Sequence, residues 1–386
     1  MHCGLCLGAC PTFEATGREL HSPRGRIAAL RNLSAGGAPT PAVALGLDEC
    51  LVCRSCESAC PSGISMESMI GHYRADRRAS RAMRRPLRDR LESWALRHVV
   101  PHPARLRGLS RLTRAARPLL RAWGVEVPTA ERLRSMRLRV DPPREPRGTV
   151  AIHRGCIADV WFRRELQATI DVLVHHGWRV ELSDAGCCGA LHRHAGSLRE
   201  AEKLEADAAR ALLAGRPDAV VCDVAGCAAS MAEPIGRAPH VVDLSGRITD
   251  TLGLLHRTGF ASPARPIPGR WVVAPPCHHR HGALSETGTR AILGALLEEG
   301  YRELPPPDHC CGAAGLYIVR HARRSREIGR RARARWDQWV DGESATPMGL
   351  ITGNAGCLLR WESLLENGPG RVVHPVVLLA EAYAEK

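Results

Sequence analysis

Aromatic residues and lysines are scarce in this sequence of 386 residues, and long apolar runs are missing. Phe, Tyr and Trp make up 4% of the chain, too few for a protein that binds nucleic acid by stacking bases on aromatic rings. No apolar run reaches the roughly 18 residues that a membrane-spanning helix needs, and no signal peptide precedes Cys3. Without a G-x-G-x-x-G motif or a P-loop, the sequence offers no site of its own for flavin, nicotinamide or ATP. We therefore expect a soluble, cytoplasmic protein with no nucleic-acid partner.

Only two of the 54 basic residues are lysines, Lys203 and Lys386, and the net charge of +14 comes from one segment. Residues 71–150 hold 21 arginines against 7 acidic residues, whereas the rest of the chain balances at 33 against 33. Prolines interrupt this segment repeatedly and prevent one long helix. We expect residues 71–147 to form a helical linker with a solvated basic face. The alternative is a basic amphipathic helix that rests on an anionic lipid surface.

Cysteines are abundant: there are 16 in a chain without an export signal, so their clusters indicate metal ligands rather than a disulfide framework. Cys50, Cys53, Cys56 and Cys60, followed by Pro61, have the spacing C-x2-C-x2-C-x3-C-P. In this pattern three closely spaced thiolates bind one [4Fe–4S] cluster, and the fourth ligates the other cluster of a pair. A zinc site would need two C-x2-C pairs with a longer spacer. The motif therefore predicts two iron–sulfur clusters.

A second group, Cys3, Cys6 and Cys10, fits the same motif without its first cysteine, which would stand directly before Met1. The two-cluster rule then gives one complete cluster and one that lacks a cysteine ligand. We expect that the natural chain starts upstream and supplies this cysteine. The alternative is a [3Fe–4S] centre or a ligand that is not cysteine. The complete set is Cys10, Cys50, Cys53 and Cys56, and the incomplete set is Cys3, Cys6 and Cys60.

After the linker, short apolar strands alternate with helices, and cysteines follow the strand ends. We predict strands over residues 150–153, 178–182 and 219–224, and again over 270–274 and 349–353. Three cysteine landmarks recur in the same order, at offsets of 121, 123 and 130 residues. The recurrence predicts an internal repeat of two α/β units.

The cysteines of each repeat are expected to meet, because the carboxyl ends of parallel strands share one sheet edge. Gly189 and Gly312 would let the backbone turn closely beside each cysteine pair. We favour metal clusters here; redox-active thiols or a vicinal disulfide are the alternative, and plain buried residues are a third. Cys222 lies inside a predicted strand and has no counterpart, so we expect a core cysteine. The expected ligand sets are Cys156, Cys187, Cys188 and Cys227 in the first repeat, and Cys277, Cys310, Cys311 and Cys357 in the second.

These motifs resemble the iron–sulfur subunit of glycolate oxidase (glycolate dehydrogenase), and the resemblance covers nearly the whole chain. The Arg-rich linker is its least specific part. The cysteine-rich repeats are similar to the CCG domains of the B subunit of heterodisulfide reductases. The matching segments are residues 2–6, 10–12, 17–20, 22–26, 50–61, 186–192, 225–227, 310–315, 353–357, 374–375 and 378–381.

The resemblance implies an α+β protein in which an α-helical ferredoxin-like domain with two [4Fe–4S] clusters precedes two tandem α/β CCG domains. The expected boundaries are residues 1–70, 71–147, 148–265 and 266–386. It further implies an electron-transfer subunit of a multisubunit 2-hydroxy-acid dehydrogenase for glycolate, or alternatively lactate. Electrons would come from FAD-containing partner subunits and pass towards a membrane quinone-type acceptor. The protein would then lie in the cytoplasm, with a peripheral position on the inner face of the cytoplasmic membrane as an alternative.

Two departures bear on the CCG repeats. The heterodisulfide-type repeat ends in C-x2-C, whereas Ser230 and Arg360 stand at the second cysteine position here. One ligand per repeat is therefore missing, although further iron–sulfur centres remain the expectation. Two alternatives to the glycolate function stay open: reduction of a disulfide at the CCG sites, or service as the iron–sulfur subunit of a related lactate or glycerol-3-phosphate dehydrogenase.

Overall fold

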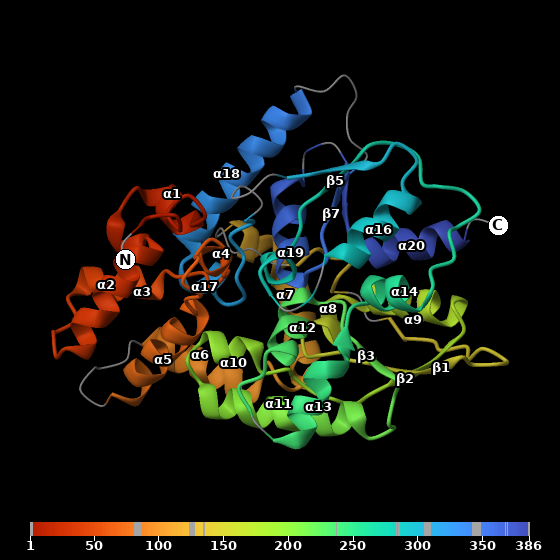
Figure 1. The fold of residues 1–386 in the computed structure, drawn as a ribbon, viewed down its shortest axis with the longest axis horizontal. Helices are drawn as coiled ribbons and strands as arrows, with labels where there is room; N and C mark the ends of the chain where they lie inside the picture. The colour runs from red at the N-terminus through yellow and green to blue at the C-terminus, as the bar shows by residue number, and fades with distance from the viewer. Residues whose placement is uncertain are drawn as a thin grey trace.

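The computed structural model describes residues 3–80, 87–122, 128–133, 136–236, 238–282, 284, 286–304, 310–341, 349–366, 368 and 370–384. Met1, on which the expected upstream start depends, lies outside these residues. The helices of the N-terminal region gather at one end of the molecule, and two α/β repeats occupy the rest (Figure 1). Within the described part of the chain, no helix has the length and apolar character to span a bilayer.

Prolines begin three helices of the N-terminal region, at the first helical position, where the missing N–H costs nothing. The Ser22 hydroxyl accepts a hydrogen bond from the amide of Gly25 at 2.9 Å and caps the second of them. The region therefore consists of short helices joined by loops that carry the cysteines. Its elements are α1 (Pro11–Thr16), the 3-10 helix η1 (Glu19–His21), α2 (Pro23–Ser34), α3 (Pro41–Asp48), α4 (Ser55–Ser58) and α5 (Met66–Ala79).

The basic segment forms two helices, α6 (Leu87–His98) and α7 (Pro103–Ala122). One face of α7 is fixed to the first repeat, because the indole N–H of Trp161 donates to Ser110 Oγ at 2.8 Å. On α6, the Leu96 carbonyl lies 2.9 Å from Nε2 of His192. Helices α6 and α7 are thus each anchored to the first repeat.

The first repeat has a four-stranded parallel sheet in the order β2-β1-β3-β4. Its central strands are short runs of Val, Ile and Ala, which is typical of strands buried on both faces. Elements, in chain order, are β1 (Gly148–Ile152), α8 (Ala158–Trp161), α9 (Arg163–His175), β2 (Trp178–Leu182), α10 (Ala190–His194), α11 (Leu198–Leu213), β3 (Ala219–Val221), α12 (Ala225–Ala232), α13 (Pro239–Arg247), β4 (Ile248–Thr249) and α14 (Thr251–Thr258).

The second repeat has the same topology, with parallel strands in the order β6-β5-β7-β8. The expectation of a helical N-terminal region followed by two α/β units is therefore confirmed. Strands β4, β6 and β8 were not among the predicted ones. Elements, in chain order, are β5 (Trp271–Val273), α15 (Cys277–Arg280), α16 (Thr287–Leu296), β6 (Tyr301–Glu303), α17 (Tyr317–Arg320), α18 (Ala322–Asp341), β7 (Gly349–Ile351), α19 (Ala355–Leu364), β8 (Arg371–Val373) and α20 (Pro375–Ala384).

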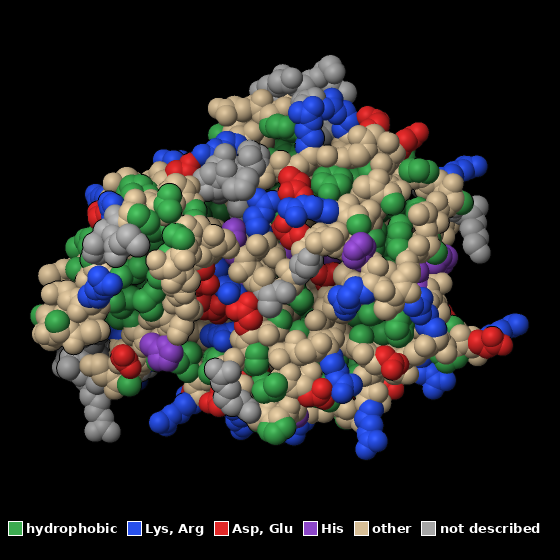
Figure 2. Space-filling model, viewed as in Figure 1, with side chains coloured by type: hydrophobic (Ala, Val, Ile, Leu, Met, Phe, Trp, Pro, Cys, Tyr) green, Lys and Arg blue, Asp and Glu red, His purple; other side chains and the backbone are tan. Residues whose placement is uncertain are grey.

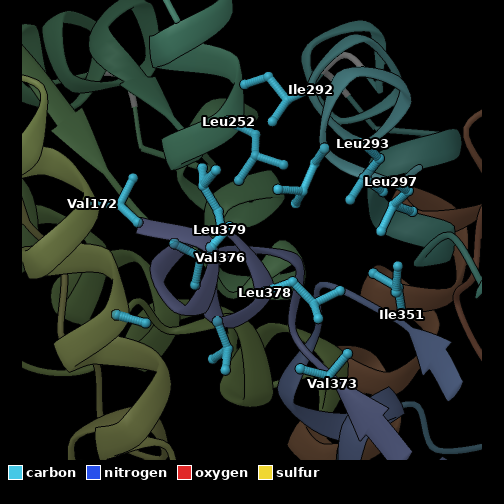
Figure 3. Packing of buried hydrophobic residues seen from close by; sticks show 14 of the residues in the cluster. Val172, Leu252, Ile292, Leu293, Leu297, Ile351, Val373, Val376, Leu378 and Leu379 are labelled. Carbon is cyan, nitrogen blue, oxygen red and sulfur yellow. The ribbon is translucent and has the colours of Figure 1, made fainter. Parts of the chain in front are cut away.

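The two repeats share a hydrophobic core. Val172 of α9 and Leu252 of α14, from the first repeat, pack with Ile292 of α16 and Leu379 of α20, from the second (Figure 3). All four side chains are almost completely buried. Because each repeat supplies apolar surface that the other covers, the two form one unit.

The N-terminal region docks on the second repeat through α1 and α18, which lie side by side (Figure 1). A buried ion pair reinforces this contact: Nε of Arg324 lies 3.1 Å from Oε2 of Glu49, the C-cap residue that directly follows α3. His21 of η1 lies 3.7 Å from the same carboxylate. The region that carries the iron–sulfur motifs is thereby held in a fixed position against the cysteine-rich repeats.

Candidate metal centres

Cys10, Cys50, Cys53 and Cys56 come together from two segments that are 40 residues apart in sequence. Cys10 precedes α1 as its N-cap, Cys50 follows α3, and Cys56 lies in α4. Burial, together with the Cys53, Cys50 and Cys10 thiols, raises the pKa of Cys56, and burial raises the pKa of Cys53 to about 11. Such thiols stay protonated unless a bound cation favours the thiolates. The grouping is the one that the two-cluster rule predicts for the complete cluster.

The backbone around Cys53 adopts an unusual conformation. Its neighbours Val52 and Arg54 have φ values of 55° and 66°, in the left-handed region that β-branched and bulky residues avoid. Arg54 is secured by ion pairs of 2.9 Å to Glu57 and 2.8 Å to Glu233. Conformations of this kind cost about 1–3 kcal/mol each and persist where the surroundings impose them. Here they curl the loop so that Cys53 faces the second repeat.

Arg26 is a residue that the sequence analysis did not single out. It is 2% exposed, and its Nη1 donates to Cys10 Sγ at 3.7 Å. The same guanidinium donates to the carbonyl of Gly46 at 2.8 Å and to Thr12 Oγ1 at 2.9 Å. A buried positive charge therefore lies directly beside one sulfur of the complete set. Its position in the Ser-Pro-Arg-Gly-Arg motif was the available signal.

Cys3, Cys6 and Cys60 form a second, more exposed group. Burial raises the pKa of Cys6, and the nearby Cys10, Cys3 and Cys60 thiols add to the effect. Hydrogen bonds from backbone amides of the following turn lower the pKa of Cys60, as befits a thiolate ligand. Cys3, Cys6 and Cys60 thus lie near one another, and Cys10 of the complete set adjoins Cys6.

In the first repeat the predicted ligands form a row of sulfur atoms beyond the strand ends. Cys156 Sγ lies 3.5 Å from Cys187 Sγ. A hydrogen bond from Cys187 raises the pKa of Cys188 to about 11, and Cys188 in turn contacts Cys227. All four predicted residues of this repeat are thereby brought together.

Cys222 also belongs to this row of sulfur atoms. The prediction that it lies inside a strand is wrong. Strand β3 ends at Val221, three residues before the predicted end, so Cys222 leaves the sheet at its carboxyl edge. The side chain is fully buried, as expected of a core residue. However, it hydrogen bonds with Cys227, and its Sγ lies 3.5 Å from Nδ1 of His153. These two hydrogen bonds outweigh burial and lower the pKa of Cys222 to about 6.

In the second repeat Cys311 and Cys357 are in direct contact, with 3.3 Å between their sulfur atoms. Cys277 and Cys310 lie nearby: burial raises the pKa of Cys310, and the Cys311 and Cys277 thiols contribute. The hydrogen bond with Cys357 lowers the pKa of Cys311, with help from the positive charge of Arg360. These four thiols therefore form one group as well.

This second group adjoins the complete N-terminal set. Cys53 and Cys310 pack against the same buried cluster, which both regions build. After burial, the Cys53 thiol is the largest influence that raises the pKa of Cys277, and it also raises that of Cys310. Ligands that are more than 200 residues apart in sequence are thus neighbours. The shared cluster consists of Ala15, Leu51, Tyr317 and Ile328.

The two Cys-Cys-Gly turns are built alike. Gly189 and Gly312 have φ values of 80° and 76°. A Cβ atom at Gly189 would lie 2.6 Å from the carbonyl oxygen of Ala201, and one at Gly312 would lie 2.7 Å from that of Ser325. Both the conformation and the close approach of a helix require glycine, which confirms the expected close turns.

The two positions that depart from C-x2-C are filled differently. Arg360 is 1% exposed, and it donates to the carbonyl of Cys311 and to Ser325 Oγ, each at 3.2 Å. Ser230 is buried in α12. In place of a ligand, the second repeat therefore has a buried cation that braces the cysteine turn.

The donor chemistry suits iron–sulfur clusters. Within the described residues, no three or more His, Cys, Asp or Glu side chains are arranged to hold a single metal ion. The sulfur ligands of a four-iron cluster surround the whole cluster and are spaced more widely than the ligands of one ion. Buried thiols in groups, without disulfides, are the arrangement that such a cluster would complete.

Comparisons with known proteins give a consistent result. Residues 1–64 match the family described as "4Fe-4S dicluster domain", and residues 150–232 and 271–360 each match "Cysteine-rich domain", known as CCG. The chain therefore carries one dicluster domain and two cysteine-rich domains, which together span most of it. No solved structure gives a significant match.

Three curated proteins illustrate the similarity. The probable glycolate oxidase iron-sulfur subunit of Bacillus subtilis is 29% identical, over all of this chain and 94% of its own length. The glycolate oxidase iron-sulfur subunit of Escherichia coli is also 29% identical, over 92% of this chain and 88% of its own. Lactate utilization protein A of Oceanobacillus iheyensis is 24% identical, over 54% of this chain and 86% of its own.

Proposed function

We propose that this homologue of glycolate oxidase iron–sulfur subunits carries electrons from an FAD-containing partner subunit, which oxidises a 2-hydroxy acid, towards a quinone-type acceptor in the membrane. Glycolate is the favoured substrate of the partner, because the two full-length relatives carry that name. Lactate is the alternative, supported by the shorter match to a lactate utilization protein. Each bound [4Fe–4S] cluster would exchange one electron at a time.

The observation that carries this proposal is the proximity of Cys53 and Cys310, which is close enough for the Cys53 thiol to raise the pKa of Cys310. The complete cysteine set of the N-terminal region and the cysteine set of the second repeat pack against one buried cluster. Arg324 and Glu49 fix the two regions to each other. Two ligand sets held this closely and rigidly favour a relay over two independent storage sites.

The incomplete set suits the approach of a partner protein. Cys3 is exposed, and Cys60 is only half-buried. Beside it, α2, α3 and α5 line an apolar groove of about 1320 Å³. Hydrophobic side chains show at this N-terminal end of the molecule in Figure 2. We infer that the flavoprotein docks at this end. Apolar groove residues include Ile27, Leu30, Leu33, Ala44, Leu45, Ile64 and Met69.

A peripheral position at the cytoplasmic membrane is supported by the outer faces of α6 and α7. Leu91 and Trp94 on α6 and Leu112 on α7 are 58%, 58% and 70% exposed. Exposed arginines such as Arg111 and Arg114 flank Leu112 on α7. Exposed apolar side chains among arginines match the surface of an anionic bilayer. Cosedimentation with phosphatidylglycerol vesicles tests this: Leu112→Glu should weaken binding, and binding by neither protein at low salt would refute it.

The decisive test of the relay is spectroscopic. Anaerobically purified protein should contain more than about eight iron atoms, because two cubanes account for eight and the relay needs a further cluster in the second repeat. On reduction, the EPR signal of the complete N-terminal cluster should show magnetic coupling to the second repeat. Cys310→Ser should remove this coupling, whereas Cys187→Ser, the matched change in the first repeat, should leave it. Coupling that survives Cys310→Ser, or zinc without sulfide, would refute the proposal.

Disulfide reduction at the CCG sites is the second candidate. The 3.3 Å and 3.5 Å sulfur–sulfur contacts in the two repeats favour it, since thiols this close can form and break disulfides. This function would be favoured if Cys187→Ser or Cys310→Ser abolished disulfide turnover while electron transfer from the flavin to the acceptor stayed intact.

A further inference from the structure

The two repeats differ at two equivalent positions beside their cysteine sets. His153 directly follows β1, whereas Ala274 follows β5. Cys222 directly follows β3, whereas Thr352 follows β7. Because both sheets have the same topology, the four residues occupy matching places at the carboxyl edges. The first repeat thus has an additional thiol and an additional imidazole where the second has neither.

The additional thiol is directed into the cysteine row. Cys222 is fully buried, and its amide donates to the carbonyl of Thr249 at 2.9 Å, which fixes the backbone to the neighbouring strand β4. On one side its sulfur hydrogen bonds with Cys227. On the other side it lies 3.5 Å from Nδ1 of His153. Cys222 packs in the hydrophobic core of the first repeat, and in addition it touches a ligand candidate and an imidazole.

His153 is itself held in place. The side chain is 2% exposed, and Nε2 lies 3.1 Å from the carbonyl oxygen of Gly186. Since a carbonyl only accepts, Nε2 carries the proton. The other nitrogen, Nδ1, is therefore directed at Cys222. Gly186 immediately precedes Cys187, so the same imidazole connects the cysteine turn with the additional thiol. Ligand sets are commonly positioned by outer hydrogen bonds of this kind.

We propose that Cys222 is a fifth cysteine ligand of the iron–sulfur centre in the first repeat and that His153 positions it. It supplies the thiolate that Ser230 cannot, from the strand end rather than from the following helix. The second repeat keeps four cysteines and has Arg360 instead. The two CCG centres of this chain are therefore chemically different. This inference rests on the proposed function, in that the first repeat must hold a cluster.

The test compares three single variants of the anaerobically purified full-length chain. Cys222→Ala removes the proposed ligand. Thr352→Ala is the matched control, because it truncates the equivalent buried side chain of the second repeat. Cys187→Ser removes a ligand that the sequence already predicts. Iron and sulfide content and the EPR spectrum of the reduced protein are the readouts, with far-UV circular dichroism to check folding.

Cys222→Ala should lose or shift the EPR signal that Cys187→Ser also affects, with a lower iron content, while Thr352→Ala keeps the wild-type spectrum. His153→Leu should shift the same signal with less loss of iron. Unchanged iron and spectrum in Cys222→Ala, alongside losses in Cys187→Ser, would refute the ligand role alone. If Cys187→Ser also changes nothing, the first repeat holds no cluster, and both proposals fail there. If Cys222→Ala does not fold, the near-isosteric Cys222→Ser takes its place with the same expectations.

Discussion

Replacing the buried Arg26 by glutamine should lower the reduction potential of the complete N-terminal cluster. Its Nη1 donates to Cys10 Sγ at 3.7 Å, and the whole side chain is buried. A positive charge next to a cluster favours the reduced form, which carries one more negative charge. Glutamine keeps a polar side chain on α2, although a shorter one, and removes the charge beside Cys10.

The size of the effect follows from the distance. With an effective dielectric constant of about 20, a unit charge at 3.7 Å interacts by about 4.5 kcal/mol, which corresponds to about 190 mV for a one-electron couple. The added electron is spread over the cluster, at roughly twice that distance, and this halves the interaction. We therefore expect the potential to fall by about 100 mV.

The assay is an anaerobic redox titration of the full-length protein, followed by EPR. Arg31→Gln is the matched control, because this substitution removes the same charge from the solvent-exposed face of the same helix. Salt and water screen the charge of Arg31, so the reduction potential should shift by about 10 mV or less in this variant. A shift in Arg26→Gln no larger than that in Arg31→Gln would refute the reasoning.

Three further predictions concern stability. Gly189→Ala should lower the free energy of unfolding by roughly 2–3 kcal/mol, because the added Cβ would lie 2.6 Å from a carbonyl oxygen. Gly186→Ala is the control, since a Cβ there meets open space and should change the free energy of unfolding in urea only slightly. Equal losses in the two variants would contradict this prediction. Glu49→Ala should lower the free energy of unfolding by about 3 kcal/mol, because Arg324 stays buried without that partner. A Glu49→Leu/Arg324→Met double variant should recover most of the lost stability, since it leaves no unpaired buried charge. A double variant that recovers none of it would count against the pairing. Burial and the nearby positive charges lower the pKa of His194 from 6.5 to about 3, so the unfolded chain takes up a proton first as pH falls. Stability should therefore be full above pH 6.5 and decline towards pH 3, by about 2 kcal/mol at pH 5, and His194→Asn should abolish that part of the pH dependence in thermal melts.

The sequence was informative where chemistry and periodicity coincide. Apolar runs that end at a cysteine located the central strands of both sheets, and the strand over residues 178–182 has the predicted bounds. The edge strands β4, β6 and β8 have only two or three residues each, too few to show an alternation. They form because an adjacent strand offers hydrogen bonds, which is a tertiary effect.

The candidate sites, too, were predictable where the pattern is local in sequence and not where it depends on tertiary packing. Ligand spacing identified the cysteine groups, because cluster motifs are local in sequence. The proximity of Cys53 to Cys310 depends on how two regions pack and leaves no local pattern in the sequence. Cys222 was misplaced because the run of apolar residues continues past the strand end at Val221. Arg360 looked like the loss of a ligand, whereas the structure uses it as a buried brace.

The shared core of the two repeats has a consequence for how the protein is made. Helix α20 lies at the end of the chain, yet it packs against α9 of the first repeat. The apolar face of α9 that meets α20 therefore stays uncovered until α20 has been made and has left the ribosome. The first repeat has further core residues of its own, so it can begin to fold before that point. Its packing is complete only when the second repeat covers α9.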